Sequence, residues 1–305
     1  MFRPFKIIKE NTKVNFLQKR KLFFLISLFL FIGSIGLTLT KSLNYGIDFR
    51  GGTLIEVQNI NGEANVSDVR GRLNGLDLGD VQIQGFGKIS DLLIRVEQLS
   101  DIEGSQQVVI DKISVELSKD HTIRRVEVVG PKVSAELIAK GITAVISAIL
   151  LVLVYIWFRF EWQFSIGAIT ALIHDVVITI GLFSLLQLEF NLSIIAALLT
   201  IVGYSLNDTV VIYDRIREEL RKYKQMPIDE LINMALNLTL SRTLMTSITT
   251  LLALLSLYFF GGEVIRGFTF AMIWGVLIGT YSSIFIASPI LIKLKVKRDW
   301  SKKND

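Results

Sequence analysis

Residues 192–213 read LSIIAALLTIVGYSLNDTVVIY, and this stretch decides the fold class. Asp208 is its only charged side chain. A helix needs ~20 mostly apolar residues to cross the ~30 Å hydrocarbon layer of a bilayer. The stretch therefore predicts a transmembrane helix that carries one carboxylate inside the membrane.

Five more apolar blocks have a similar length and composition. The six blocks together are 22–40, 137–158, 164–185, 192–213, 243–260 and 267–292. The 305 residues are 51% hydrophobic and their mean hydropathy is +0.50, which is more apolar surface than a soluble domain of this length can bury. The sequence predicts an α-helical polytopic membrane protein with six transmembrane helices. The first block has a basic leader but no small-residue cleavage site, so we interpret it as an uncleaved anchor.

The net charge of +5 is concentrated in a few segments. Seven basic residues precede Leu22, six follow Ile292 and five lie between Arg215 and Lys224. By the positive-inside rule, this distribution places the tails 1–21 and 293–305 and the loop 214–242 in the cytoplasm. The basic residues thus indicate orientation and some attraction to the lipid bilayer, and we expect no nucleic-acid partner.

The loop 214–242 contains apolar residues at helical spacing after Pro227. This pattern predicts either an amphipathic helix on the cytoplasmic membrane surface or a solvated hairpin.

Residues 41–136 have the composition of a globular domain, with 15 acidic and 11 basic residues, and we expect this domain to be exported. Apolar alternation predicts strands at 53–59, 80–86, 91–97 and 122–129, and helical spacing predicts helices at 66–76 and 101–118. The order βαββαβ is that of an α+β ferredoxin-like domain. The segment 137–292 is then a five-helix transmembrane bundle that includes the loop 214–242.

Several kinds of chemistry are excluded by the residues present. The chain has no cysteine, and its histidines, His121 and His174, are too far apart to suggest a metal cluster. There is no phosphate-binding loop, so we expect neither ATP hydrolysis nor a cofactor. If the protein performs work, an ion gradient worth about 2.3 kcal/mol per charge per 100 mV is the expected source.

Ionisable residues inside the predicted spans are the candidate functional residues, because each costs about 2.5–3.5 kcal/mol at the bilayer centre. Asp208 follows Tyr204 and Ser205 on one helix face, with Asn207 beside it, and Arg242 begins the next span at comparable depth. Protons could pass through these residues. A static buried ion pair that fixes helix packing is the alternative.

His174 and Asp175 lie near the middle of the third block. A carboxylate next to an imidazole at mid-membrane could relay protons. The alternative is a hydrogen-bonded clamp between helices, which we favour for His174, whereas both interpretations stay open for Asp175.

Six short motifs recur in order along almost the whole chain. They are GIDFRGGT at 46–53, VGPKVS at 129–134, WFRFEW at 157–162, ALIHD at 171–175, GYSLNDT at 203–209 with DRIRE at 214–218, and SRT at 241–243. Together they resemble the SecD/SecF family of protein-export membrane proteins, in the resistance-nodulation-division superfamily.

The resemblance implies a bacterial inner-membrane protein that works with SecD at the SecYEG channel, with YajC and YidC as further partners. It implies that the proton-motive force helps to move and release unfolded exported polypeptides, and that Asp208 and Arg242 match the proton-path residues of the family. The motif residues Asp48, Phe49, Gly51, Gly52 and Thr53 are those of the family, although Arg50 replaces its usual threonine. Paired glycines at this position suit a tight turn into the sheet, or a simple linker.

Two other functions remain as hypotheses. A half-transporter of the efflux type would be expected to carry larger exported loops and a second set of six spans. A scaffold that only stabilises a translocon needs no proton path, because buried charges can be structural.

Overall fold

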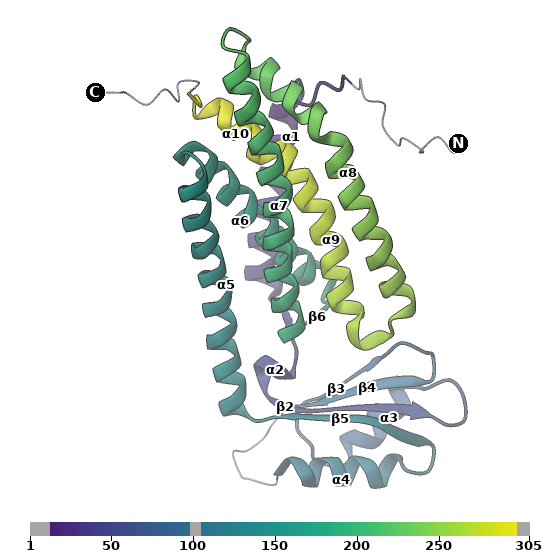
Figure 1. Cartoon of the computed structure of the whole chain (residues 1–305). Helices are drawn as coiled ribbons and strands as arrows, with labels where there is room; N and C mark the ends of the chain where they lie inside the picture. Colours follow the sequence, from purple (N-terminus) through teal and green to yellow (C-terminus); the bar gives the residue numbers. More distant parts are fainter. Residues whose placement is uncertain (1–12, 98–104, 298–305) are drawn as a thin grey trace, which may run out of the picture.

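A computed structural model describes residues 13–97 and 105–297. A bundle of long helices carries a small α+β domain at one end (Figure 1). The ends of both predicted tails lie outside the described residues, as does the beginning of the helix predicted at 101–118.

The six predicted spans are confirmed as six long, apolar helical segments. Five are continuous: α1 (Arg20–Lys41), α5 (Pro131–Arg159), α6 (Trp162–Leu186), α7 (Leu192–Lys222) and α8 (Ile228–Phe260). The sixth comprises a 3₁₀ turn (Glu263–Ile265), α9 (Arg266–Ser282), a π-helical turn (Ser283–Ala287) and α10 (Ser288–Lys293). The segments α6, α7 and α9 are the most buried, whereas α1, α5 and α8 expose most of their side chains. The buried polar residues of α6, α7 and α9 therefore lie in the centre of the bundle.

Two glycines let α9 approach α7 closely. A Cβ atom on Gly279 would lie 3.0 Å from Cβ of Ser205, and one on Gly275 would overlap the side chain of Ile201. Small residues four apart on one face are a common means of close helix contact in membranes. Here they bring the serines of the two helices near each other.

The segment 214–242 differs from the predicted loop. Helix α7 continues to Lys222 and α8 begins at Ile228, which leaves only 223–227 as a connection. The apolar spacing reflects burial within the bundle rather than contact with a membrane surface, because Ile216, Leu220 and Leu231 belong to one buried cluster.

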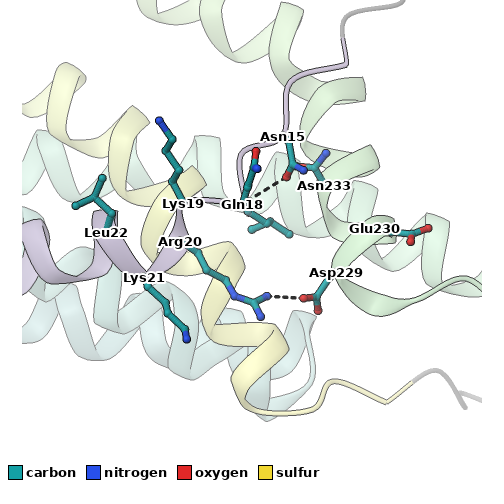
Figure 2. A pocket seen from close by; sticks show the side chains of 10 residues that line it. Asn15, Gln18, Lys19, Arg20, Lys21, Leu22, Asp229, Glu230 and Asn233 are labelled. Carbon is teal, nitrogen blue, oxygen red and sulfur yellow. Dashed lines mark hydrogen bonds and ion pairs between the residues drawn. The ribbon is translucent and has the colours of Figure 1, made fainter.

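The first part of α8 is also held by the chain segment that precedes α1. The Oδ1 atoms of Asn233 and Asn237 accept hydrogen bonds from the backbone N–H groups of Phe16 (2.9 Å) and Val14 (2.8 Å). Arg20 forms an ion pair of 2.6 Å with Asp229 at the same place (Figure 2). Because of these contacts, the amphipathic first part of α8 is held against the chain and continues into the transmembrane part of the same helix.

The α+β domain contains the predicted strands and helices in the predicted order. They are β2 (Gly52–Asn59), α3 (Val66–Asn74), β3 (Val81–Gly85), β4 (Asp91–Val96), α4 (Ser105–Leu117) and β5 (His121–Val129). The antiparallel sheet has the order β3-β4-β2-β5, which is compatible with a ferredoxin-like unit.

The two faces of this sheet have different neighbours. Ile55 and Ile94 pack in a core with residues of α3 and α4, which lie on the side away from the bundle (Figure 1). Leu54 and Leu93 point to the opposite face and pack with Ile47, close to the bundle. Strand alternation therefore gives the domain one core of its own and one apolar face for docking.

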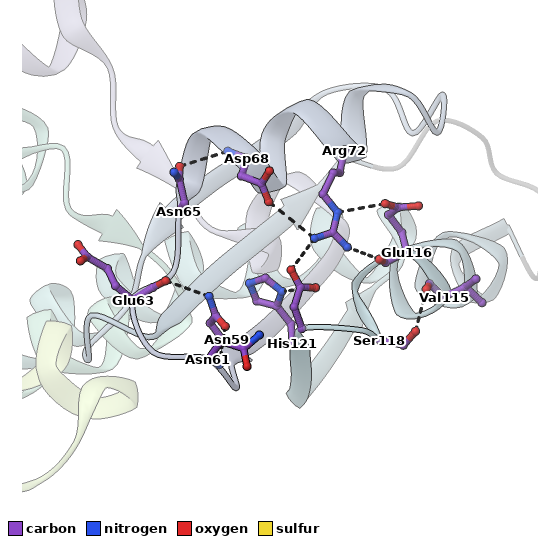
Figure 3. A network of polar contacts seen from close by, with 11 residues as sticks. Asn59, Asn61, Glu63, Asn65, Asp68, Arg72, Val115, Glu116, Ser118 and His121 are labelled. Atoms are coloured by element: carbon purple, nitrogen blue, oxygen red, sulfur yellow. Dashed lines mark hydrogen bonds and ion pairs between the residues drawn. The ribbon is translucent and has the colours of Figure 1, made fainter.

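Arg72 joins the two helices of the domain to the start of β5 (Figure 3). Its guanidinium lies 3.0 Å from Glu116 and 2.7 Å from Asp120. The hydrogen bond from Arg72 holds the pKa of Asp120 below its usual value, against the opposing effect of burial. This cluster stabilises the face of the domain that is remote from the bundle.

Three short elements were not predicted. They are β1 (Asn44–Tyr45), α2 (Ile47–Arg50) and β6 (Glu189–Phe190), and β1 pairs with β6 in parallel. Elements of two to four residues carry no periodic pattern, so the sequence offered no signal for them.

Candidate functional site

Asp175 on α6 lies at the centre of a buried cluster of polar side chains. Its Oδ2 atom accepts hydrogen bonds from Ser205 of α7 and Ser282 of α9, both at 2.7 Å. Its Oδ1 atom lies 3.0 Å from Nδ1 of His174. The carboxylate is 1% exposed, so each of its oxygens is satisfied by the protein alone. Asp175 thus ties together three helices.

The edge of the His174 ring that does not contact Asp175 faces a different part of the bundle. The ring stacks on Tyr281, with centroids 6.3 Å apart, and lines a groove between α1 and α6. Within the described parts of the chain, its Nε2 atom is buried without a hydrogen-bond partner. His174 therefore has one nitrogen committed to Asp175 and one that remains open to a ligand or a proton.

Asp208 lies one helical turn beyond Ser205 on α7 and is 3% exposed. Thr243 of α8 and Thr280 of α9 lie beside its carboxylate, and Arg242 is close enough for its charge to act on it. Even so, Oδ2 of Asp208 has no hydrogen-bond partner among the described residues. This carboxylate is buried like Asp175, but one of its two oxygens is left without a donor.

The structure does not bring Arg242 and Asn207 into this buried cluster. Both side chains are exposed on the surface of the chain, and over the described ranges Arg242 forms no ion pair with Asp208. Arg242 lies near the middle of α8 and Asn207 near the middle of α7. Two polar side chains thus lie on the surface of the bundle rather than in its core.

Further hydroxyl groups connect α7, α8 and α9 near Asp208. The hydroxyls of Ser247 and Thr280 are 2.8 Å apart, and Tyr204 donates to Ser247 over 3.3 Å. Sequence reasoning missed Ser247, Thr280 and Ser282, because a serine or threonine in a membrane helix usually bonds to its own backbone and gives no distinct signal.

The segment 46–53 forms the joint between the α+β domain and the bundle. Asp48 accepts a hydrogen bond of 2.8 Å from the backbone N–H of Leu192, the first residue of α7. Asn191, the residue that precedes the helix, makes no side-chain cap. Asp48 therefore supplies the cap from a distant part of the chain, where a negative charge also complements the helix dipole.

The paired glycines have a steric role at this joint. Gly51 and Gly52 have φ angles of 74° and 119°, which only glycine adopts readily, and a Cβ on Gly52 would overlap the carbonyl oxygen of Val96. Thr53 is then buried in β2, while Phe49 packs on Phe190 with ring centroids 5.9 Å apart. The turn expected from the glycines is present, and it leads the chain from α2 directly into the central strands.

An ion pair crosses the same joint. Arg95 of β4 lies 2.9 Å from Glu189 of β6, and the side chain of Arg95 is 9% exposed. Burial raises the pKa of Glu189, whereas Arg95 opposes this shift. Sequence reasoning did not identify this pair, since the two residues belong to different predicted domains.

Carboxylates and one imidazole are the ionisable groups buried at these positions. No group of three or more histidine, cysteine or acidic residues is placed to hold a metal ion within 13–97 and 105–297. The groups that can exchange protons inside the bundle are the carboxylates of Asp175 and Asp208 and the ring of His174, and hydroxyl groups surround both carboxylates.

Two models of known protein families match this chain. Residues 109–297 match the family "Protein export membrane protein SecD/SecF, C-terminal", and residues 36–58 match the family "SecD/SecF GG Motif". The chain therefore belongs to the SecD/SecF family of protein-export membrane proteins.

Relatives of the chain within this family are SecF and SecDF subunits of the protein translocase. The chain is 46% identical to the protein translocase subunit SecF of Cereibacter sphaeroides, a match that covers 98% of this chain and 95% of the relative. It is 43% identical to SecF of Rickettsia rickettsii, over 98% of this chain and 97% of the relative. The protein translocase subunit SecDF of Brucella abortus is 42% identical over 97% of this chain, but only 39% of that longer protein is covered.

Two solved structures have the same fold. The crystal structure of SecDF from Thermus thermophilus, a translocon-associated membrane protein, matches with a TM-score of 0.86 and 36% identity, over 95% of this chain and 40% of that one. A SecDF structure in the super-membrane-facing form matches at the same identity with a TM-score of 0.69. The second SecDF structure is therefore less similar in shape to this chain than the first.

Proposed function

We propose that this chain acts as the SecF subunit of a bacterial protein translocase, and that proton binding at Asp208 drives its contribution to the release of exported polypeptides. The observation that carries the proposal is the buried Asp208 carboxylate with an unpartnered oxygen inside the helix bundle. Uptake of a proton removes the cost of a charge in this dry site, and loss of the proton restores it.

A conformational change is required to couple proton movement to work. In our proposal Asp208 alternates between a site near Arg242, which favours the charged carboxylate, and a dry site, which favours the protonated form. One charge moving through a potential of about 100 mV provides roughly 2.3 kcal/mol. The joint at 46–53 would carry the movement to the α+β domain, because Asp48 binds directly to the first residue of α7.

SecD is the proposed partner in the membrane. Arg242 and Asn207 are exposed on helices that are long and apolar enough to span a membrane. Polar side chains facing lipid are unfavourable, so a polar surface of another protein is expected to cover them. The relatives in which SecD and SecF form one chain support the same pairing. The SecYEG channel, YajC and YidC are proposed as further partners from family membership, and co-purification with the SecD complex would test each of them.

The proposed orientation places both termini and residues 223–227 in the cytoplasm and the α+β domain outside. Because the chain has no cysteine, single cysteines can report the orientation directly. A cysteine at Asn61, in an exposed loop of the domain, should react with an impermeant thiol reagent in intact spheroplasts. A cysteine at Gln225 should react only after the membrane is opened, and the reverse labelling pattern would refute the orientation.

Asp208→Asn tests the proton-coupled function, since it preserves the shape of the side chain but cannot exchange a proton. We expect the variant to assemble with SecD in normal amounts and to abolish stimulation of protein export by an imposed proton gradient. Thr200→Ala is the matched control, because Thr200 is exposed on the same helix and its hydroxyl bonds to the backbone oxygen of Ala196 in α7. Export at the normal rate by Asp208→Asn under the gradient would reject proton coupling at Asp208 and favour a scaffold function.

A further inference from the structure

An apolar groove opens on the side of the bundle at the end that carries the α+β domain. Its volume is about 410 Å³, and its walls are formed by α5, α6 and α7. Ile142 and Ile146 of α5 are more than half exposed along one wall. Pockets of ~300–1,000 Å³ with mostly apolar walls and one or two polar groups are typical of small-molecule sites.

The groove extends through about one leaflet of the bilayer. Val176 lies ten residues before the end of α6, and at about 1.5 Å per residue this is a depth of ~15 Å, or half of the ~30 Å hydrocarbon layer. Tyr45, Phe49 and Phe190 close the groove at its shallow end, where their rings pack together. Aromatic side chains at such a boundary are typical of the membrane–water interface.

Arg50 is the single charged residue among those that line the groove, and it lies at the same shallow end. Its side chain is exposed, and in the described part of the chain no carboxylate or hydrogen-bond acceptor pairs with it. A guanidinium binds phosphate oxygens with two parallel hydrogen bonds. An apolar channel one leaflet deep and a free guanidinium at its mouth match the two parts of a phospholipid.

We propose that this groove binds one phospholipid, with an acyl chain between α5, α6 and α7 and the phosphate on Arg50. The site is separate from the polar cluster around Asp208, and the proposal does not depend on proton coupling. It gives a function to the arginine that interrupts the glycine motif at 46–53. A bound lipid would fix α5 against α7 at the joint, since α5 otherwise buries few of its residues.

Gly141 keeps the groove open. The nearest side-chain atoms to a Cβ at this position belong to Ile195, at 3.8 and 3.9 Å, which is ordinary contact distance. A leucine at this position would therefore occupy the groove without forcing the backbone of α5 to move. Gly141→Leu tests the acyl-chain site, and Arg50→Gln tests the phosphate site.

The full chain, purified in mild detergent, would be titrated with phosphatidylglycerol and the bound lipid counted by native mass spectrometry. We expect one retained lipid, about tenfold weaker binding for Arg50→Gln, and no retained lipid for Gly141→Leu. Lys140→Gln is the control, because Lys140 is an exposed cation on α5 that pairs with Glu136 and does not line the groove. Equal binding by Arg50→Gln and the parent chain, or equal loss for Lys140→Gln, would overturn the proposal.

A second measurement identifies the occupant in the assembled complex. A photo-reactive amino acid at Ile142 would be activated in membranes that contain the chain and its SecD partner. The expected product is a covalent lipid adduct, detected by its mass. A crosslink to SecD or to an exported polypeptide in place of the lipid adduct would show that a protein fills the groove and would overturn the proposal.

Discussion

Asp175 and Asp208 are both buried carboxylates in the same bundle, yet their surroundings differ. Asp175 receives two hydroxyl hydrogen bonds on one oxygen and contacts His174 with the other. Asp208 has a threonine on each side, but its Oδ2 atom remains without a partner in the part of the chain that the structure describes. Asp175 therefore holds three helices together through its hydrogen bonds, whereas one oxygen of Asp208 makes no such bond to the described residues.

This comparison also bears on the two hypotheses for the buried charges. Asp175 bonds to Ser205 and Ser282 of two other helices, whereas the hydrogen bond of His174 in the described residues is to Asp175 of the same helix, so the interhelical clamp favoured for His174 stays a prediction. The static ion pair considered for Asp208 and Arg242 is absent from the described conformation. A functional role for Asp208 remains a proposal, and measurements on both carboxylates can test it.

The largest expected effect is that of Asp175→Ala. Removal of this carboxylate leaves the hydroxyl of Ser205 and the ring of His174 buried without their acceptor, and leaves Ser282 only its 3.1 Å hydrogen bond to the backbone oxygen of Gly279. We expect a loss of about 3 kcal/mol or more in the free energy of unfolding, because each stranded polar group costs roughly 1–3 kcal/mol. Unfolding in mixed micelles with increasing denaturing detergent would measure it.

Asp208→Ala is the matched comparison for that measurement. We expect it to cost about 1 kcal/mol or less, since no fully formed hydrogen bond to Oδ2 is lost. Equal destabilisation by the two variants would contradict the distinction between the two sites.

A smaller difference in the free energy of unfolding is expected when one hydroxyl group is removed at each of the two sites. Ser282→Ala removes a 2.7 Å hydrogen bond to Asp175, and we expect a cost of about 1 kcal/mol. Thr243→Val removes a buried hydroxyl that has no hydrogen-bond partner among the described residues, so a change within about 0.5 kcal/mol is expected. The same unfolding assay measures both variants, and a greater loss for Thr243→Val would show that Asp208 is also firmly hydrogen-bonded.

The smallest effect concerns Asp120, a carboxylate with a charged partner outside the membrane. Arg72 lowers the pKa of Asp120 below 3.8 in the folded chain. The folded state thus releases this proton more readily than the unfolded state, so the stabilisation is present above the unfolded pKa and is lost as the pH falls through the folded pKa. The effect should be small, because the Asp120 side chain is 28% exposed and solvent screens the pair.

Hydrogen exchange of the β5 amides between about pH 5 and pH 2 would follow this loss of protection, after correction for the intrinsic exchange rate. Asp120→Asn should flatten the dependence on pH. An unchanged slope in Asp120→Asn would assign the acid sensitivity to another group.

The sequence by itself predicted the six spans, the order of strands and helices in the α+β domain, and the buried ionisable residues. These features depend on local composition and periodicity, and a charge inside an apolar block is visible without any knowledge of its neighbours. The glycine pair was also recognisable, because residues that require a positive φ angle are few.

The tertiary structure decided which groups meet. Ser205 and Ser282 lie 30 and 107 residues from Asp175 in sequence, and nothing in their local patterns indicates that they bond to it. The ion pair between Arg95 and Glu189 and the cap that Asp48 provides for α7 likewise depend on how the domain docks on the bundle. Hydrogen bonds and ion pairs act over a few ångströms in space, and only the packing of α6, α7 and α9 determines that one carboxylate is satisfied and the other is not.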